Sequence, residues 1–197
     1  QSTLLGTRPV IYNVCNYAKP ATGKPALISW DDVITLFHEF GHALHGLFAN
    51  QRYATLSGTN TPRDFVEFPS QINEHWASHP VVFEHYARHY ESGEPMPVAL
   101  RESLFRAANF NKGYDMTELL SAALLDMNWH RVSTTALPQD VDSFEAQALQ
   151  QENLNLAAVP PRYRSSYFSH LFGGGYAAGY YAYLWTQMLA DAGSQWF

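Results

Sequence analysis

The segment WDDVITLFHEFGHALHGLFA, residues 30–49, is the feature that most constrains how this chain can fold. At about 100° per residue, the helical period gathers its apolar side chains on one continuous stripe. The stripe consists of Val33, Phe37, Phe40, Leu44 and Leu47. Ser29, with Asp32 three residues later, forms a capping-box pattern that begins helices. The segment therefore predicts an amphipathic helix that packs the stripe against a core and turns its other face outward.

The other face of this helix carries histidines and one carboxylate. His38 and His42 lie about 40° apart on the helical wheel, so both imidazoles can reach one metal ion. Glu39 is offset by about 60° from His42, which places it to touch a water molecule on the metal. This H-E-x-x-H arrangement is typical of zinc hydrolases. It predicts two zinc ligands, a general base at Glu39, and a supporting or cleft-lining role for His45.

Two other histidine pairs have the same four-residue spacing: His75 with His79, and His85 with His89. Neither pair has the intervening glutamate, and both pairs lie among charged residues. His79 precedes Pro80, where an imidazole can oppose the dipole at the end of a helix. We expect these four histidines to lie on the surface without binding metal.

The rest of the chain is predicted to be mainly α-helical with one small β element. RPVIYNVCNY, residues 8–17, is rich in β-branched and aromatic residues and predicts a short strand, which Pro9 places at a sheet edge. Further helices are expected near 81–90, 97–109, 117–132 with Thr117 as cap, 142–152 with Asp142 and Glu145 as a capping box, and 177–191 closed by Gly193. No internal boundary is visible, so residues 1–197 are expected to form one region.

Charge and composition exclude several classes of partner. The net charge is −6 and no run of basic residues occurs, which argues against nucleic acid. Residues 165–190 lack charged side chains, but their glycines and tyrosines would be poorly solvated in lipid, so a buried tyrosine-lined wall is favoured over a membrane span.

A single cysteine, Cys15, fits a reducing compartment such as the cytoplasm. The chain starts with Gln1 and is expected to be a piece of a longer polypeptide.

A catalytic zinc ion takes three protein ligands and keeps one position open, and the third ligand lies outside the helix. FHEFGHALH followed by GTNTPRDFVEFPSQ resembles the thimet-oligopeptidase (M3) family of zinc peptidases. SHLFGGGYAAGYYAYLW adds a resemblance to the bacterial peptidyl-dipeptidases of that family. The similarity covers only the C-terminal, metal-bearing part of those longer enzymes. It implies a zincin-like fold with one zinc ion per chain, Glu67 as the third ligand, and substrate or transition-state contacts from His170, Tyr176 and Tyr183.

The residues alone leave two roles open for Glu67. Asp64 and Glu67 have capping-box spacing, so the Glu67 side chain could bond to a backbone N–H. Thr61 followed by Pro62 is an equally good helix start, and it would free Glu67 to bind metal. Pro69 should kink or restart the helix in either case.

Tyr176 and Tyr183 also have two interpretations. They are seven residues apart, which on a helix puts both hydroxyls on one face, where a phenol can donate to an oxyanion. The glycines at 173–175 would let the backbone approach a substrate or move. Aromatic-rich helices are more often core, however, and Tyr180 and Tyr181 are expected to be buried.

The expected function is zinc-dependent hydrolysis of short peptides, and the resemblance implies release of C-terminal dipeptides. The alternatives are an oligopeptidase that cuts internally, and a zinc-binding fragment that is inactive without the rest of the chain, which is expected to form the other cleft wall. Arg162 and Arg164 are candidates for holding a substrate carboxylate, with surface ion pairs equally possible. Residues 10–16 are expected to flank the zinc as an edge strand and pair with the substrate main chain.

Overall fold

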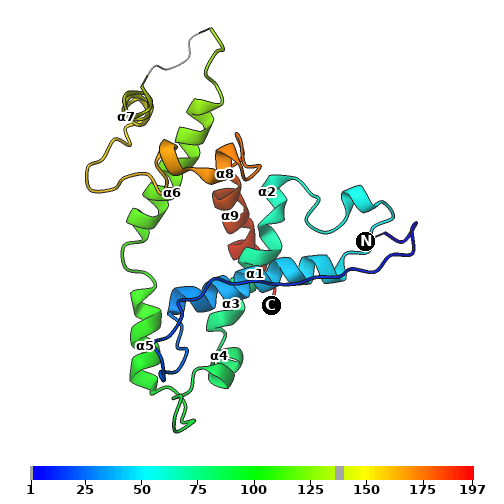
Figure 1. Cartoon of the computed structure of the whole chain (residues 1–197). Coiled ribbons are helices and arrows are strands. Elements are labelled where there is room, and N and C mark those ends of the chain that lie inside the picture. The colour runs from blue at the N-terminus through cyan, green and yellow to red at the C-terminus, as the bar shows by residue number, and fades with distance from the viewer. Residues whose placement is uncertain (1, 136–139) are drawn as a thin grey trace. The chain divides into compact units, whose positions relative to one another are not determined.

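The computed structural model describes residues 2–135 and 140–197, and it is mainly helical (Figure 1). The chain divides into two compact units, each of which is described by itself below. The first contains the residues up to Met96 together with Thr186–Phe197, and the second contains Pro97–Trp185. None of the described helices is long and apolar enough to cross a membrane.

The first unit is built on two helices that pack against each other, α1 (Trp30–Phe48) and α3 (Phe68–Ser78). The capping box that begins α1 is confirmed, since Ser29 Oγ accepts from Asp32 N at 3.1 Å and Asp32 Oδ2 accepts from Ser29 N at 3.0 Å. The short helix α2 (Arg63–Val66) precedes α3, and α4 (Pro80–Tyr86) follows it. A 3₁₀ turn covers Ala54–Leu56.

The close approach of α3 to α1 depends on Gly41. A Cβ atom at this position would lie 2.6 Å from Pro69 O and 2.6 Å from Ser70 Cα, so any larger residue would push the helices apart.

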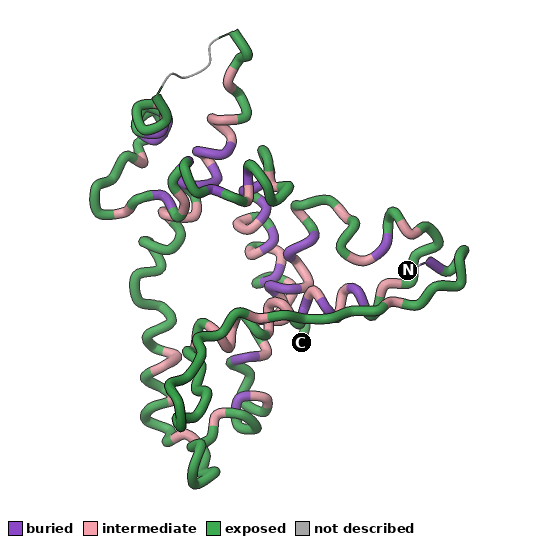
Figure 2. Tube along the Cα trace, viewed as in Figure 1, coloured by how far each residue is buried: buried purple, intermediate pink, exposed green. Residues whose placement is uncertain are grey.

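The expectation that α1 packs its apolar stripe against a core is only partly right. Its buried residues are small ones, whereas Phe40 and Leu47 keep 49% and 48% of their surface exposed. Figure 2 shows the mixture of buried and exposed positions along this helix.

The strand expected over residues 8–17 is wrong. The structure has no strand in its described residues, and isolated bridges such as Ser2 with Thr7 are the remaining β features there. A strand must place its N–H and C=O groups on a neighbour, and residues 8–20 make no backbone hydrogen bond to any described residue. Instead this segment runs irregularly beside α1, with the Ile11 side chain against Gly46. The fold class is thus mainly α without the small β element, and the zincin-like fold stays a prediction.

The second unit contains α5 (Val98–Ala107), α6 (Lys112–Trp129), α7 (Val141–Gln151) and α8 (Ser169–Phe172), with a 3₁₀ turn at Ser165–Tyr167. The helix α9 (Ala182–Ser194) begins in this unit and ends in the first. Small residues of α6 pack here against an aromatic cluster. This core consists of Ala122, Ala123, Phe168, Leu171 and Tyr180.

The starts of α6 and α7 differ from those expected. α6 begins at Lys112, so Thr117 is internal and its hydroxyl donates to Gly113 O instead of capping. α7 is capped by Asp140, which accepts from Ser143 N at 2.7 Å. The expected cap pair fails because Glu145 is buried and its carboxylate accepts from Ser165 N instead.

The last helix starts later and ends later than expected. α9 begins at Ala182, because residues 177–181 form turns instead of a helix. Gly193 lies inside α9 and does not close it. A Cβ at Gly193 would lie 3.1 Å from Ile72 Cδ1, so this glycine allows α9 to pack closely against α3.

Candidate metal centre

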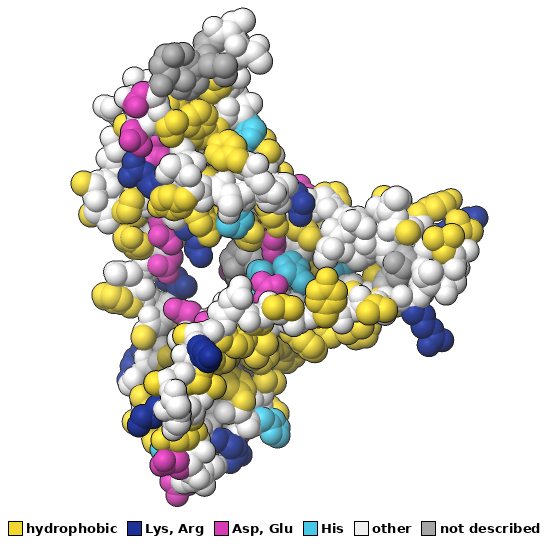
Figure 3. All heavy atoms as spheres, in the orientation of Figure 1, with side chains coloured by type: hydrophobic (Ala, Val, Ile, Leu, Met, Phe, Trp, Pro, Cys, Tyr) yellow, Lys and Arg dark blue, Asp and Glu magenta, His cyan; other side chains and the backbone are white. Residues whose placement is uncertain are grey.

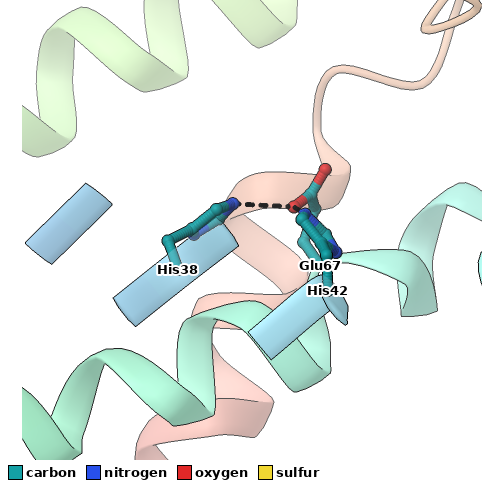
Figure 4. A group of neighbouring side chains, drawn as sticks. All are labelled: His38, His42 and Glu67. Carbon is teal, nitrogen blue, oxygen red and sulfur yellow. Dashed lines mark ion pairs between the residues drawn. The ribbon is translucent and has the colours of Figure 1, made fainter. Parts of the chain in front are cut away.

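Three potential ligands converge in the first unit (Figure 4). His38 and His42 lie one turn apart on α1, and Glu67 lies at the junction of α2 and α3. Glu67 Oε2 is 3.3 Å from His38 Nε2 and 3.1 Å from His42 Nε2. The three ligand atoms all lie within 4.8 Å of one another, which is close enough for one ion to contact them all. Within residues 2–135 and 140–197, no other group of three or more His, Cys, Asp or Glu side chains brings its ligand atoms this close together.

The interruption between α2 and α3 sets the position of Glu67. α2 ends at Val66 and α3 begins at Phe68 with Pro69 in its first turn, so the proline restarts the helix. Glu67 makes no side-chain cap bond, and the N-cap of α2 is Pro62, so neither expected capping pattern forms. Instead the Glu67 side chain is 4% exposed, and Ser70 Oγ donates to its Oε2 at 3.2 Å.

His38 is held from its other ring nitrogen. Its Nδ1 lies 2.6 Å from Glu74 Oε1, two turns beyond Glu67 on α3. Burial by itself lowers the pKa of His38, but hydrogen bonds to Glu67 and Glu74 raise it to about 9. A metal ion at Nε2 would take the place of the proton shared there with Glu67, while Nδ1 keeps donating to Glu74. Two imidazole nitrogens and one carboxylate oxygen therefore form a donor set that fits zinc.

Replacing Glu74 with glutamine is expected to weaken zinc binding about 10- to 100-fold, because an amide fixes the His38 ring less well and lowers its basicity. Zinc affinity would be measured by competition with a chromogenic chelator. Glu84→Gln is the matched control, since Glu84 is an exposed carboxylate on the next helix, α4. Equal affinities for the two variants would show that Glu74 does not support the ligand.

Glu39 lines a pocket of about 340 Å³ together with His42 and is not one of the three converging ligands. The other walls are residues 8–13 and residues 57–59. The irregular segment thus lies beside the site even though it forms no strand, and pairing of substrate with its main chain stays a prediction. Figure 3 shows histidine and acidic side chains gathered over α1, next to a broad hydrophobic surface.

The remaining histidines of the first unit have other surroundings. The His45 ring meets Phe65 edge-on, and burial, followed by the nearby His42, lowers its pKa. His75 Nε2 lies 3.2 Å from Asp191, and His89 Nδ1 accepts from Ser92 N at 3.2 Å. None of these belongs to the converging group.

In the second unit, His170, Tyr176 and Tyr183 form one aromatic cluster. The rings of Tyr176 and Tyr183 are stacked, with centroids 5.3 Å apart and an interplanar angle of 16°. The His170 ring centroid lies 6.0 Å from that of Tyr176 and 6.2 Å from that of Tyr183. The two tyrosines do not share a helix face, since Tyr176 precedes α9, so a tight loop brings them together instead.

The neighbouring tyrosines divide between core and surface. Tyr180 is 3% exposed, as expected for a core residue, and burial raises the pKa of its hydroxyl. Tyr181 is 41% exposed, so its expected burial is wrong.

Both arginine candidates have carboxylate partners within the second unit. Arg162 Nη1 lies 3.6 Å from Glu118 Oε1. Arg164 is paired with the buried carboxylate of Glu145 and lies 3.9 Å from Asp142. In this structure both arginines therefore form ion pairs within the protein, which is the alternative to holding a substrate carboxylate.

Glu74 is a site residue that the sequence reasoning missed. The signal was present, since Glu74 follows Glu67 by seven residues, which is two helical turns. Its significance depends on α3 packing against α1, which spacing along one helix does not reveal.

The chain is similar to known peptidases over nearly its whole length. Residues 2–197 match the family model described as Peptidase family M3. Over all 197 residues the chain is 76% identical to dipeptidyl carboxypeptidase of Salmonella typhimurium and 74% identical to that of Escherichia coli, and it spans 29% of each. It is 39% identical to oligopeptidase A of Escherichia coli over 187 residues, which are 93% of this chain and 27% of that protein.

Proposed function

Because the chain belongs to peptidase family M3, we propose that it is the zinc-binding catalytic region of a metallopeptidase that cleaves short peptides. The observation that carries this proposal is the convergence of His38, His42 and Glu67. One zinc ion per chain would be held by these three side chains. When bound, zinc acts as a Lewis acid on a water molecule and on the substrate carbonyl.

Glu39 supplies the proton transfer. Its carboxylate lies in the pocket that His42 also lines, outside the ligand group, so it is available to a water molecule there. It accepts the proton of the attacking water and passes it to the leaving amine. Glu74 keeps the His38 ring oriented during this cycle.

The aromatic cluster supplies neutral donors. The Tyr176 and Tyr183 hydroxyls donate to the oxyanion that develops on the carbonyl, and His170 supports the same substrate contacts. These roles follow the family resemblance, and the stacking of the two phenol rings supports a shared task. Residues 10–13 offer backbone groups for an extended peptide.

The rest of a longer chain is proposed to complete the cleft, since this chain spans 29% of its dipeptidyl carboxypeptidase relatives. The half-exposed Phe40 and Leu47 on α1 are apolar surface that such a segment would cover. A cytoplasmic location, and the absence of nucleic-acid and membrane partners, stay predictions.

Release of C-terminal dipeptides is the proposed specificity, supported by the identity to the two dipeptidyl carboxypeptidases. An internally cutting oligopeptidase is the second candidate, supported by the lower identity to oligopeptidase A. The test is to assay metal-loaded protein on peptides of equal length with free or amidated C-termini. Cleavage of the free-ended peptide alone selects the first, and cleavage of both selects the second. Zinc binding without turnover contradicts both and selects the third alternative, a zinc-binding fragment that is inactive without the rest of the chain.

A further inference from the structure

Asp126 is a wholly buried carboxylate in the last turn of α6, and the mechanism above does not use it. Burying a carboxylate is costly unless its oxygens accept hydrogen bonds. No Lys or Arg of the described residues pairs with Asp126. Its partners are backbone amides of the loop before α9: Oδ1 accepts from Ala178 N at 2.8 Å, and Oδ2 accepts from Tyr180 N at 2.9 Å.

His130 holds this carboxylate from the other side. It follows Asp126 by one helical turn, and its Nδ1 lies 2.7 Å from Asp126 Oδ1. The His130 ring stacks on Phe172, with centroids 6.4 Å apart and an interplanar angle of 28°. A ring fixed in this way is placed to donate its N–H and to keep the carboxylate turned toward the loop.

The loop needs such an anchor at this point. Ala178 has a φ of 51°, a left-handed conformation that residues with a Cβ disfavour. Glycines at 173–175 leave the preceding backbone many alternatives, and Gly175 also has a positive φ, of 78°. The two hydrogen bonds that Asp126 accepts come from the amides of Ala178 and Tyr180. They therefore fix the backbone at the residue with the strained φ and just after it.

This loop determines how the phenol rings meet. Tyr176 lies two residues before Ala178, and Tyr183 lies three residues after Tyr180. Residues 177–181 form turns between them, and the two rings are stacked. We propose that Asp126, oriented by His130, is a positioning residue that holds Tyr176 and Tyr183 for transition-state stabilisation in peptide hydrolysis. The inference rests on the proposed function and adds to it a residue that touches no substrate.

The first test compares Asp126→Asn with Asp115→Asn in purified, metal-loaded protein. Asparagine keeps the size but turns an NH₂ group toward one of the two loop amides, so one loop bond is lost. We expect kcat to fall on the order of 10- to 100-fold with little change in KM and in zinc content, because the tyrosines act in the transition state. Asp115 is an exposed carboxylate on the same helix, and its variant should keep full activity.

A double-mutant cycle with Tyr183→Phe separates positioning from general stability. If Asp126 acts through the tyrosine pair, Asp126→Asn should cost less than about 3-fold in kcat once the Tyr183 hydroxyl is gone. If the double variant instead loses kcat by the product of the two single losses, the two residues act independently. That result would overturn the inference while leaving the proposed function in place. A wild-type protein without peptidase activity would instead overturn the proposed function and this inference with it. Tyr183→Phe with full activity would remove the tyrosine from the mechanism and overturn this inference alone.

His130→Phe covers the case in which Asp126→Asn does not fold. Phenylalanine keeps the ring contact with Phe172 and removes only the N–H donor at the edge of α6. We expect a smaller fall in kcat, about 3- to 10-fold, that also disappears in the Tyr183→Phe background. An unchanged kcat in His130→Phe, when Asp126→Asn is unfolded, would overturn the inference.

Discussion

Glu39→Gln is expected to keep its zinc and to lose peptidase activity by about 100- to 10,000-fold, the usual contribution of a general acid–base group. The physical reason is that glutamine has nearly the same shape but cannot accept a proton from the attacking water. Zinc should remain because the converging atoms belong to His38, His42 and Glu67 and not to Glu39. The measurement is kcat/KM on a free-ended peptide beside metal content determined by atomic spectroscopy.

Asp31→Asn is the matched control for this variant, since Asp31 is an exposed carboxylate in the first turn of the same helix. It should keep both zinc and activity. Loss of zinc from Glu39→Gln would contradict the separation of base and ligands that the helix register predicts. Retained turnover would remove Glu39 from the mechanism.

Glu67→Ala should lower zinc affinity by orders of magnitude, because one of three protein ligands is removed. The contrary hypothesis, in which Glu67 only caps a helix, forecasts a loss of about 1 kcal/mol in the free energy of unfolding with metal retained. The structure favours the first outcome, since Glu67 makes no cap bond and its Oε2 faces both histidines. A metal titration beside a thermal melting curve of the metal-free protein distinguishes the two.

Asp64→Ala is the control here. Asp64 is the other member of the sequence capping pattern and lies outside the converging group. Its variant should bind zinc with normal affinity. Equal zinc affinity in the Glu67 and Asp64 variants would refute the ligand role of Glu67.

The sequence by itself determined the features that depend on local periodicity. The bounds of α1, its capping box and the shared face of His38 and His42 follow from a helical repeat, which is set by backbone geometry within a few residues. The family was also visible in the sequence, because its motifs are short, contiguous and specific. Helix existence was predicted well elsewhere, whereas helix ends were not, since caps such as Asp140 compete with neighbours that offer similar side chains.

Tertiary structure decided everything that needs a partner distant in the chain. Residues 8–17 have strand-forming side chains, but no described strand lies beside them to accept their hydrogen bonds. Glu67 could have been cap or ligand on spacing alone, and only the packing of α3 on α1 turns it toward the histidines. Asp126 looks like any polar residue of a helix until its carboxylate meets amides more than fifty positions later. The physical reason is common to these cases: a hydrogen bond or ligand contact takes its energy from both partners, and the sequence near one partner does not contain the other.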